Sequence, residues 1–464
     1  MGAMNYARRP GIDSVALSAL AARERERFVA THTESARLAK LSAAHWLNGV
    51  PMHWMRDWST PHPLFVRTAQ GVELTDVDGN HYIDFCFGDT GAMFGHSPAA
   101  IARALSETGA TGITSMLPAE RVARVGEKLA QMFGLPFWQM TQTATDANRA
   151  VLRWARAITG RPRVLVFDGC YHGTVEETLV RALPEMQDKG GTRPRAGLIG
   201  MNHDVSVTTD AVPFNDAAAV ERVLARGRTA ALIAEPVMTN IGMVLPEPGF
   251  LANLRALTRK HGVLLIIDET HTLSTARGGY TRAQNLEPDI WVCGKAIAGG
   301  MPCAVFGFTA EVEAGMRRVQ EGRAGGHSGM GTTLSANALA LACLEASLDE
   351  LMTSANYSAM HDCASYLSEG LGHVFATEAL SWHVARVGAR LEFGFGNAAR
   401  NGAESERSAW PELELAIHLY LLNRGVLLTP FHNMMLCSPV TTTAHADTLL
   451  KHLHDVLREV GSTS

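Results

Sequence analysis

The sequence predicts an α/β protein with one large domain built around a mostly parallel sheet and a second, smaller α+β domain. Five short apolar runs, each long enough for one buried strand, alternate with segments of helical periodicity. From about residue 340 the pattern changes to longer helices with fewer strands. The 464 residues exceed what one compact core holds, and a hydrophobic content of 46% is enough for two.

The N-terminal part of the chain predicts an arm followed by a hairpin. Residues 18–47 carry apolar side chains at roughly helical spacing. The stretch "VELTDVDGNHYIDF" (72–85) then alternates polar and apolar residues around an Asp-Gly turn, which is typical of a β-hairpin. We assign residues 1–75 to an N-terminal arm that also forms part of the small domain.

The middle of the chain carries the strands of the predicted sheet. An amphipathic helix, "PGFLANLRALTRKHG" (248–262), ends in glycine and lies between two of the runs. Strands that alternate with helices in this way pair in parallel, and we assign residues 76–340 to the large domain. The five runs are "RVLVF" (163–167), "AALIA" (230–234), "VLLII" (263–267), "IWVCG" (290–294) and "AVFGF" (304–308).

The last part of the chain predicts the small domain, residues 341–464. It follows on the helix "SANALALACLEASLDEL" (335–351) and ends in the amphipathic helix "HADTLLKHLHDVLREV" (445–460), with shorter strands between. No internal repeat or low-complexity segment interrupts it.

Composition excludes several classes of function. The 41 basic and 46 acidic residues are spread along the chain, so no basic stripe predicts nucleic-acid binding. Seven scattered cysteines without a C-x-x-C pair argue against a disulfide framework or a metal site. No apolar run is long enough to span a membrane and no signal sequence is evident, so we expect a cytoplasmic protein that acts on small molecules.

Chemically active residues follow four of the apolar runs. They are Tyr171 with His172 in "DGCYHG", then Glu235, Asp268 and Lys295. Each alone has an ordinary explanation as a helix cap or a loop residue. Ligands of parallel sheets bind beyond the carboxyl ends of the strands, so the four together predict a site at that edge.

Lys295 and Asp268 indicate one cofactor. A lysine is protonated and non-nucleophilic at neutral pH unless its environment changes that, and an imine with an aldehyde overcomes this limit. Pyridoxal 5′-phosphate needs a lysine for a Schiff base, an acid at its pyridine nitrogen and a cradle for its phosphate. Lys295, flanked by glycines in "VCGKAIAGGMP" (292–302), and Asp268, at the end of a buried strand, provide the first two.

The third requirement has two candidates. Thr143, Ala144 and Thr145 immediately precede the amphipathic segment that ends at residue 160, and amide groups at a helix start bind anions. A second hydroxyl cluster, "GMGTTLSANA" (329–338), contains Thr333 and also precedes a helix. Both patterns are equally typical of plain helix capping.

The order of these motifs resembles the class-III aminotransferases of the fold-type-I pyridoxal-phosphate enzymes, which include glutamate-1-semialdehyde aminomutases and ω-aminotransferases. The resemblance implies that fold: a large cofactor-binding domain with a seven-stranded-type sheet, a small domain from both chain ends, and a homodimer with shared active sites. The motifs that carry it are "GVELTDVDGNHYIDF", "GDTGAMFGHSPAAIARAL", "GCYHG", "AEPV", "IIDETHT", "CGKAIAGGMP", "GTTLSAN" and "NRGVLLTP".

The resemblance also implies roles for single residues. Lys295 is similar to the Schiff-base lysine, Asp268 to the partner of the pyridine nitrogen, and Tyr171 to the aromatic residue that stacks on the ring. His172, next to Tyr171, is expected to bind the cofactor as well. Glu235 matches the family's acid near the site, and Thr143 to Thr145 match its phosphate loop. Thr333 matches a threonine that reaches the phosphate from the neighbouring subunit.

The sequence departs from the family pattern at several of these positions. The usual Ser-Gly-Thr-Glu of the phosphate loop reads Thr-Ala-Thr-Asp (143–146), and Ala144 tolerates positive φ poorly, which predicts a differently shaped loop. Thr270 and His271 replace a commoner Val-Met type pair, so His271 either faces the ring or packs.

Substrate residues are predicted from three further places. Arg56 in "VPMHWMRDW" (50–58) is a candidate clamp for a carboxylate, or it pairs with the adjacent Asp57. Trp54 and Trp58 from the same stretch either form an apolar wall for a bulky substrate side chain or pack in the protein interior. Arg390 in "RVGARLEF" is a second candidate for the carboxylate.

These residues predict an aminotransferase that moves an amino group from an amine or amino acid donor to a keto acid or aldehyde. The alternative is a glutamate-1-semialdehyde-type 2,1-aminomutase, in which the amine returns to the adjacent carbon of the same molecule. Both use the same cofactor residues, so the motifs do not separate them. A dinucleotide enzyme is excluded because no G-x-G-x-x-G loop is present.

Overall fold

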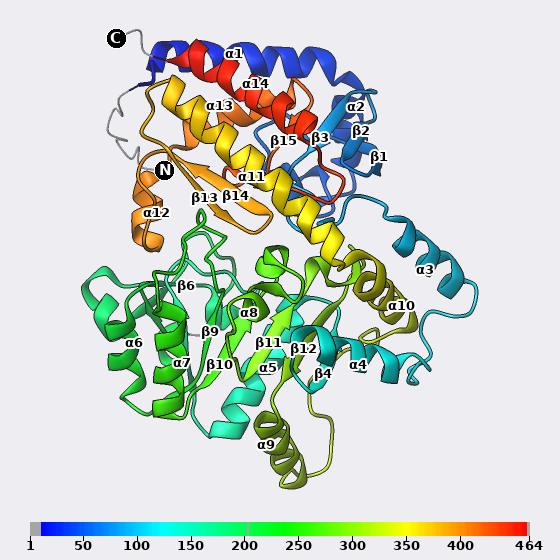
Figure 1. Cartoon of the computed structure of the whole chain (residues 1–464), viewed down its shortest axis with the longest axis vertical. Coiled ribbons are helices and arrows are strands. Elements are labelled where there is room, and N and C mark those ends of the chain that lie inside the picture. Colours follow the sequence, from blue (N-terminus) through cyan, green and yellow to red (C-terminus); the bar gives the residue numbers. More distant parts are fainter. Residues whose placement is uncertain (1–10, 202–203, 462–464) are drawn as a thin grey trace.

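The computed structural model of the chain describes residues 11–201 and 204–461 (Figure 1). At the centre of its lower lobe lies a seven-stranded sheet in the order β4-β12-β11-β10-β9-β5-β8. Within this sheet β12 is antiparallel to both of its neighbours, and the remaining pairs are parallel. The strands are β4 (Phe137–Thr141), β5 (Arg163–Phe167), β8 (Thr209–Val212), β9 (Thr229–Ala234), β10 (Leu264–Asp268), β11 (Ile290–Cys293) and β12 (Ala304–Phe308).

The five apolar runs of the sequence form five of these strands, and the predicted α/β class with a mostly parallel sheet is confirmed. The sequence missed β4 and β8. Strand β4 is half exposed, with Phe137 at 37%, so it lacks the fully apolar pattern of a buried strand. Strand β8 is short and carries Asp210, whose carboxylate pairs with Arg163.

Helices cover this sheet and position its functional edge. Helix α5 (Ala144–Thr159) lies along β9, β11 and β12, and α9 (Ala310–Glu321) packs on it. Helices α6 (Ala217–Leu224) and α7 (Phe250–His261) pack on each other beside β8 and β10. Helix α4 (Val122–Phe133) lies against β4, and α3 (Ala99–Gly109) against α10 (Ala338–Ala346).

The upper lobe is built from both ends of the chain (Figure 1). One sheet joins β1 (Val66–Gln70), β2 (Glu73–Asp76) and β3 (His81–Asp84) to β15 (Val426–Leu427), and the predicted hairpin is β2 with β3. A second sheet pairs β13 (His383–Val387), β14 (Arg390–Gly394) and β16 (Met434–Leu436). In the lower lobe, β6 (Val180–Ala182) pairs with β7 (Thr192–Pro194) beside β8. The helices are α1 (Ser14–Thr31), α2 (Thr33–Ser42), α11 (Ser354–Thr377), α12 (Gly402–Ser408), α13 (Pro411–Leu422) and α14 (Thr443–Val460).

The buried apolar side chains divide into one large and two smaller clusters. The large cluster fills both faces of the seven-stranded sheet and continues through α10 into α11 as far as Met360. The second cluster combines Leu17 and Leu20 of α1 with Leu453 and Val460 of α14. The division of the chain at residues 75 and 340 stays a prediction.

Among the described helices, none has the length and apolar character needed to cross a membrane. All seven cysteines are free and buried.

Candidate active site

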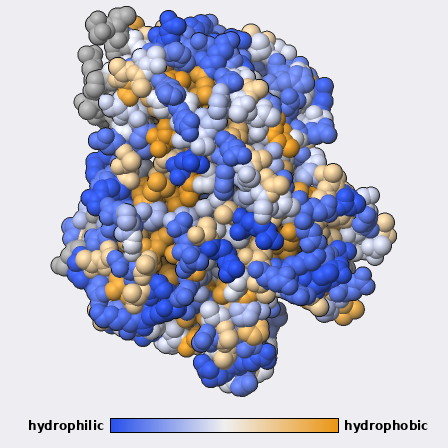
Figure 2. Space-filling view, viewed as in Figure 1, coloured by the Kyte–Doolittle hydropathy of each residue, from blue (hydrophilic) through white to orange (hydrophobic). Residues whose placement is uncertain are grey.

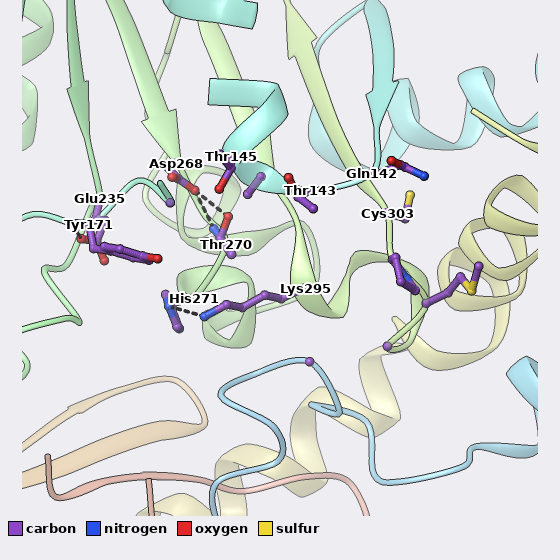
Figure 3. A pocket seen from close by; sticks show the side chains of 16 residues that line it. Gln142, Thr143, Thr145, Tyr171, Glu235, Asp268, Thr270, His271, Lys295 and Cys303 are labelled. Carbon is purple, nitrogen blue, oxygen red and sulfur yellow. Dashed lines mark hydrogen bonds between the residues drawn. The ribbon is translucent and has the colours of Figure 1, made fainter. Parts of the chain in front are cut away.

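One pocket collects side chains from the carboxyl ends of β10 and β11, the start of α5 and two loops (Figure 3). Its volume is about 310 Å³. Parallel strands place their ligand sites at this edge. The lining residues are Gly91, Gln142, Thr143, Ala144, Thr145, Tyr171, Gly173, Glu235, Asp268, Thr270, His271, Lys295, Gly300, Met301, Pro302 and Cys303.

Asp268 is the buried acid of this pocket, with 4% of its surface exposed. Its Oδ1 accepts hydrogen bonds from the amide and hydroxyl of Thr270, at 3.1 and 2.7 Å, and Oδ2 accepts one from Asn148 at 2.8 Å. His172 Nδ1 lies 3.0 Å from Oδ2. Burial alone would raise the pKa of Asp268, but His172 and the other donors lower it, so the carboxylate stays ionised.

His172 stands behind Asp268 and does not line the pocket. Its ring is 1% exposed and contacts the carboxylate, so in this structure it supports the acid. Burial alone would lower the pKa of His172, but Cys170 and Asp268 raise it to about 10. The predicted contact of His172 with the cofactor stays a prediction.

The two acids of the "DET" stretch have separate tasks. Glu269 is fully buried and points away from the pocket, where it accepts hydrogen bonds from the Tyr280 and Thr281 amides at 2.5 and 2.6 Å and from the Trp291 indole at 3.0 Å. Glu269 therefore fixes the turn after β10, and Asp268 serves the pocket.

Lys295 begins the short helix that follows β11, and its side chain points into the pocket (Figure 3). Its Nζ donates to Asp89 Oδ2 at 2.5 Å and lies 2.8 Å from His271 Nε2. Lys295 has a φ of 48°, in the left-handed region that non-glycine residues rarely occupy. Such backbone strain is often found at functional sites.

His271 connects Lys295 to a buried arginine. Its Nδ1 lies 2.8 Å from the Thr90 hydroxyl, and this hydroxyl accepts a hydrogen bond from Arg390 Nη2. Burial lowers the pKa of His271 well below its usual value, and Lys295 lowers it further, so the imidazole is neutral. Its two ring nitrogens can therefore hold one proton between Thr90 and Lys295.

The start of α5 forms an anion cradle. The amides of Ala144 and Thr145 open the helix, where backbone N–H groups have no acceptor within the helix. The Thr143 hydroxyl caps it by accepting from the Asp146 amide at 3.2 Å. Ala144 has a helical backbone conformation and a negative φ. The alanine at this position therefore does not force the different loop shape that the sequence predicted.

Glycine keeps this cradle open. A Cβ added to Gly294, next to Lys295, would lie 3.1 Å from the Ala144 amide nitrogen and 2.9 Å from its Cβ. One added to Gly173 would collide with the Thr145 hydroxyl. The backbone before Lys295 thus approaches the helix start closely enough that only glycine fits.

Tyr171 and Glu235 form the side of the pocket away from the cradle (Figure 3). Glu235 Oε1 accepts from the Tyr171 amide at 3.2 Å, and Oε2 accepts from the Thr239 hydroxyl at 2.6 Å. Burial raises the pKa of Glu235. Tyr171 is 36% exposed, which leaves its ring open to a planar ligand.

The predicted substrate residues other than His271 lie outside this pocket. Trp54 and Arg56 are exposed. Trp58 packs against the third apolar cluster, which is formed by Phe28, Leu74, Tyr82, Leu419, Leu422 and Leu427. Arg390 is 1% exposed, and its Nη2 donates a hydrogen bond to the Thr90 hydroxyl, which lies beside His271. Thr333 is exposed on a loop beside the pocket, where the Thr332 hydroxyl donates to Gln142 at 3.5 Å.

Four contributing residues were not predicted: Asp89, Thr90, Asn148 and Thr270. Asn148 lies one helical turn inside α5, where a buried polar residue among apolar ones is the signal that could have found it. Asp89 and Thr90 follow β3 in a loop without periodicity, and their role is visible only in three dimensions.

These residues fit pyridoxal 5′-phosphate. Lys295 can bind the aldehyde carbon of this cofactor, and the Asp268 carboxylate can contact its ring nitrogen. The amides at the start of α5, together with Thr145, can bind its phosphate. Among the described residues, no group of three or more His, Cys, Asp or Glu side chains is placed to hold a metal ion.

Comparisons with known proteins agree with this geometry. The family model for class-III aminotransferases matches residues 54–457. A glutamate-1-semialdehyde 2,1-aminomutase of Sorangium cellulosum (strain So ce56) is 35% identical over 373 residues, which cover 79% of this chain and 83% of the relative. The crystal structure of a glutamate-1-semialdehyde-aminomutase from Pseudomonas aeruginosa PAO1 has a TM-score of 0.94 and 45% identity, covering 97% of this chain and 100% of that one. A lysine-to-alanine variant of that protein, crystallised in complex with PMP, matches with the same values.

Proposed function

Because the chain belongs to the class-III aminotransferase family, whose members depend on pyridoxal phosphate, we propose that it moves an amino group between adjacent carbons of one molecule, as a 2,1-aminomutase. The relatives and the solved structure named above support this over the intermolecular aminotransferase that the sequence first predicted. The substrate by analogy is glutamate 1-semialdehyde or a similar amino aldehyde.

One observation carries the amino-group chemistry that both activities share: Lys295 and Asp268 line a single pocket from the ends of adjacent parallel strands. The relatives named above favour the aminomutase over the aminotransferase. The lysine amine and the ionised acid are the two groups that amino-group chemistry at a pyridoxal ring requires. No other lysine lines that pocket in the described part of the chain.

Asp268 would hold the cofactor by its ring nitrogen and would keep that nitrogen protonated. Its lowered pKa keeps it anionic, and four hydrogen-bond contacts fix its orientation. When bound, pyridoxal phosphate supplies an aldehyde that binds the substrate amine and a ring that accepts electrons from the adjacent carbon.

Lys295 moves the substrate proton. With the cofactor bound, its Nζ would take the proton from the carbon that loses the amine and would deliver a proton to the adjacent carbon that receives it, so that the isomerisation leaves the hydrogen count unchanged. Asp89 at 2.5 Å and His271 at 2.8 Å keep Nζ directed over the pocket. The neutral His271 offers its Nε2 to Nζ as a hydrogen-bond partner and so helps to orient the amine.

The proposal includes a homodimer with shared sites. Side chains of the 113–117 segment are strongly exposed, with Met116 at 79% and Leu117 at 74%, and Leu334 is exposed at 50%. The Ala338 amide donates to the Ile113 carbonyl at 2.9 Å, so the two segments adjoin beside the pocket. Exposed apolar groups of this kind are typical of an interface between subunits, which supports the predicted role of Thr333 across it.

A cytoplasmic location is also part of the proposal. Seven free cysteines are what a reducing compartment maintains.

The direct test supplies the purified holoenzyme with glutamate 1-semialdehyde alone. We expect an isomer in which the amine sits on the adjacent carbon, and no product from a Lys295→Ala variant. In parallel, a panel of amine donors is offered with pyruvate or 2-oxoglutarate. Turnover that requires one of these acceptors, with no isomerisation of the amino aldehyde, would replace the aminomutase by an intermolecular aminotransferase.

A further inference from the structure

A second pocket lies where α12, α13 and β14 of the upper lobe meet the 240–244 loop. Figure 1 shows α12 at the boundary between the two lobes. Apolar side chains gather on this part of the surface in Figure 2. The pocket has a volume of about 180 Å³ and is formed by the 240–244 loop, the end of β14, α12, α13 and residues 431–433. It shares no lining residue with the Lys295 pocket.

Glu392 is the central polar group of this second pocket. Neighbouring residues of β14, Leu391 and Phe393, belong to the second apolar cluster, so Glu392 points to the opposite face of the strand. It is 5% exposed, and its Oε1 lies 3.0 Å from His432 Nδ1. Its Oε2 is buried and has no hydrogen-bond partner within residues 11–201 and 204–461. A buried carboxylate oxygen without a donor is costly, and a donor from a ligand would remove that cost.

The charge around Glu392 is negative. Glu414 of α13 also lines the pocket, and its pKa is raised to about 7, mainly by burial; His432 opposes this rise and Glu392 contributes to it. A third acid, Glu406, is paired with Arg181. No lysine or arginine is among the described residues that line the pocket. His432 is thus the principal cationic partner of two carboxyl groups.

Aromatic rings complete the pocket. Phe395 and Phe431 line it together with Met243, and Phe431 is 49% exposed at the protein surface. A ring face attracts a cation at a distance of a few ångströms, and an adjacent carboxylate adds a charged acceptor. Carboxylate oxygens and aromatic faces are the two groups that bind organic ammonium ions.

We propose that this pocket binds the ammonium group of a small organic cation. Its N–H donates to Glu392 Oε2, and its apolar part lies against Phe395 and Phe431. This binding is separate from the chemistry at Lys295 and does not depend on the substrate proposed there.

The test is calorimetric titration of the holoenzyme with N,N-dimethylbenzylammonium chloride at pH 8. This tertiary amine carries one N–H donor and cannot condense with the cofactor aldehyde. We expect saturable binding of one cation per chain, without a change in the absorbance of the cofactor. Glu392→Gln should weaken it by about tenfold or more, since a hydrogen bond to a charged group contributes about 1.5–3 kcal/mol.

Two further variants complete the design. Glu412→Gln removes an exposed acid from the same helix as Glu414 and should bind like wild type. Phe431→Ala changes a half-exposed side chain, so the protein should fold, and we expect binding weakened by about threefold or more through the lost ring contact. Absence of binding by wild type at millimolar probe, equal affinity in the wild type and both pocket variants, or a cofactor spectrum that shifts with the probe would overturn the proposal.

Discussion

Replacing Thr90 by valine removes the hydrogen-bonded link between Arg390, His271 and Lys295. Thr90 is fully buried, and its hydroxyl accepts from Arg390 and lies 2.8 Å from His271 Nδ1. Valine has nearly the same shape and the same branching at Cβ. The strain of the Thr90 backbone, with a φ of 85°, is therefore similar in both proteins.

The hydrogen bonds lost with the Thr90 hydroxyl determine how far the free energy of unfolding should fall. A hydrogen bond from a charged donor is worth about 1.5–3 kcal/mol, and one between neutral groups about 0.5–1.5 kcal/mol. Arg390 cannot lose its proton, so its charge stays buried with one acceptor fewer. We expect Thr90→Val to lower the free energy of unfolding by about 2–4 kcal/mol.

The assay is urea unfolding of the cofactor-free protein, followed by tryptophan fluorescence, because bound cofactor would add its own stabilisation. Thr90→Ser is the matched control: it keeps the hydroxyl and loses one methyl group, at a cost of about 1 kcal/mol. If Thr90→Val is as stable as wild type, or no less stable than Thr90→Ser, the hydrogen-bonded link does not contribute as we describe.

Three further predictions concern the pocket. Asp268→Asn should lower kcat by about a hundredfold or more, with cofactor still bound by absorbance, and an unchanged kcat would contradict its role at the ring nitrogen. His172 has a folded pKa of about 10 against its usual 6.5, so its stabilising effect is complete below pH 6.5 and is lost as the pH rises toward 10. The difference in unfolding free energy between wild type and His172→Gln should shrink across that range, and a constant difference would refute the ion pair. Gly294→Ala should weaken cofactor binding in equilibrium dialysis by about tenfold through contact with Ala144, whereas Gly126→Ala, which meets no neighbouring atom, should leave it unchanged.

The residues that the sequence could identify are those tied to strand ends. Asp268 and Lys295 follow long apolar runs, and a parallel sheet brings the ends of such strands together. The family resemblance and the cofactor that these motifs predicted are confirmed by the family model and the relatives. The sequence could not predict that β12 runs antiparallel to its neighbours, because a buried strand is equally apolar in either direction.

Other residues could not be placed because long-range contacts decide them. Phe87, Asp89 and Thr90 all have positive φ in a loop without periodicity, and only the folded chain shows that the loop meets Lys295. His271 was left between facing the ring and packing, and the structure places it in the pocket against Nζ. The place of the Arg390 side chain at the site depends on the contact between β14 and the loop that carries Thr90, which is far away in the sequence.

The central claim is that Lys295 carries the cofactor. Borohydride reduction of the protein after incubation with excess pyridoxal phosphate, followed by tryptic mass mapping, measures this directly. We predict one cofactor adduct per chain on the peptide 283–317, with the internal tryptic site at Lys295 uncut. Adducts confined to the other five lysines, Lys40, Lys128, Lys189, Lys260 and Lys451, with peptide 283–317 unmodified and cleaved at Lys295, would contradict the account.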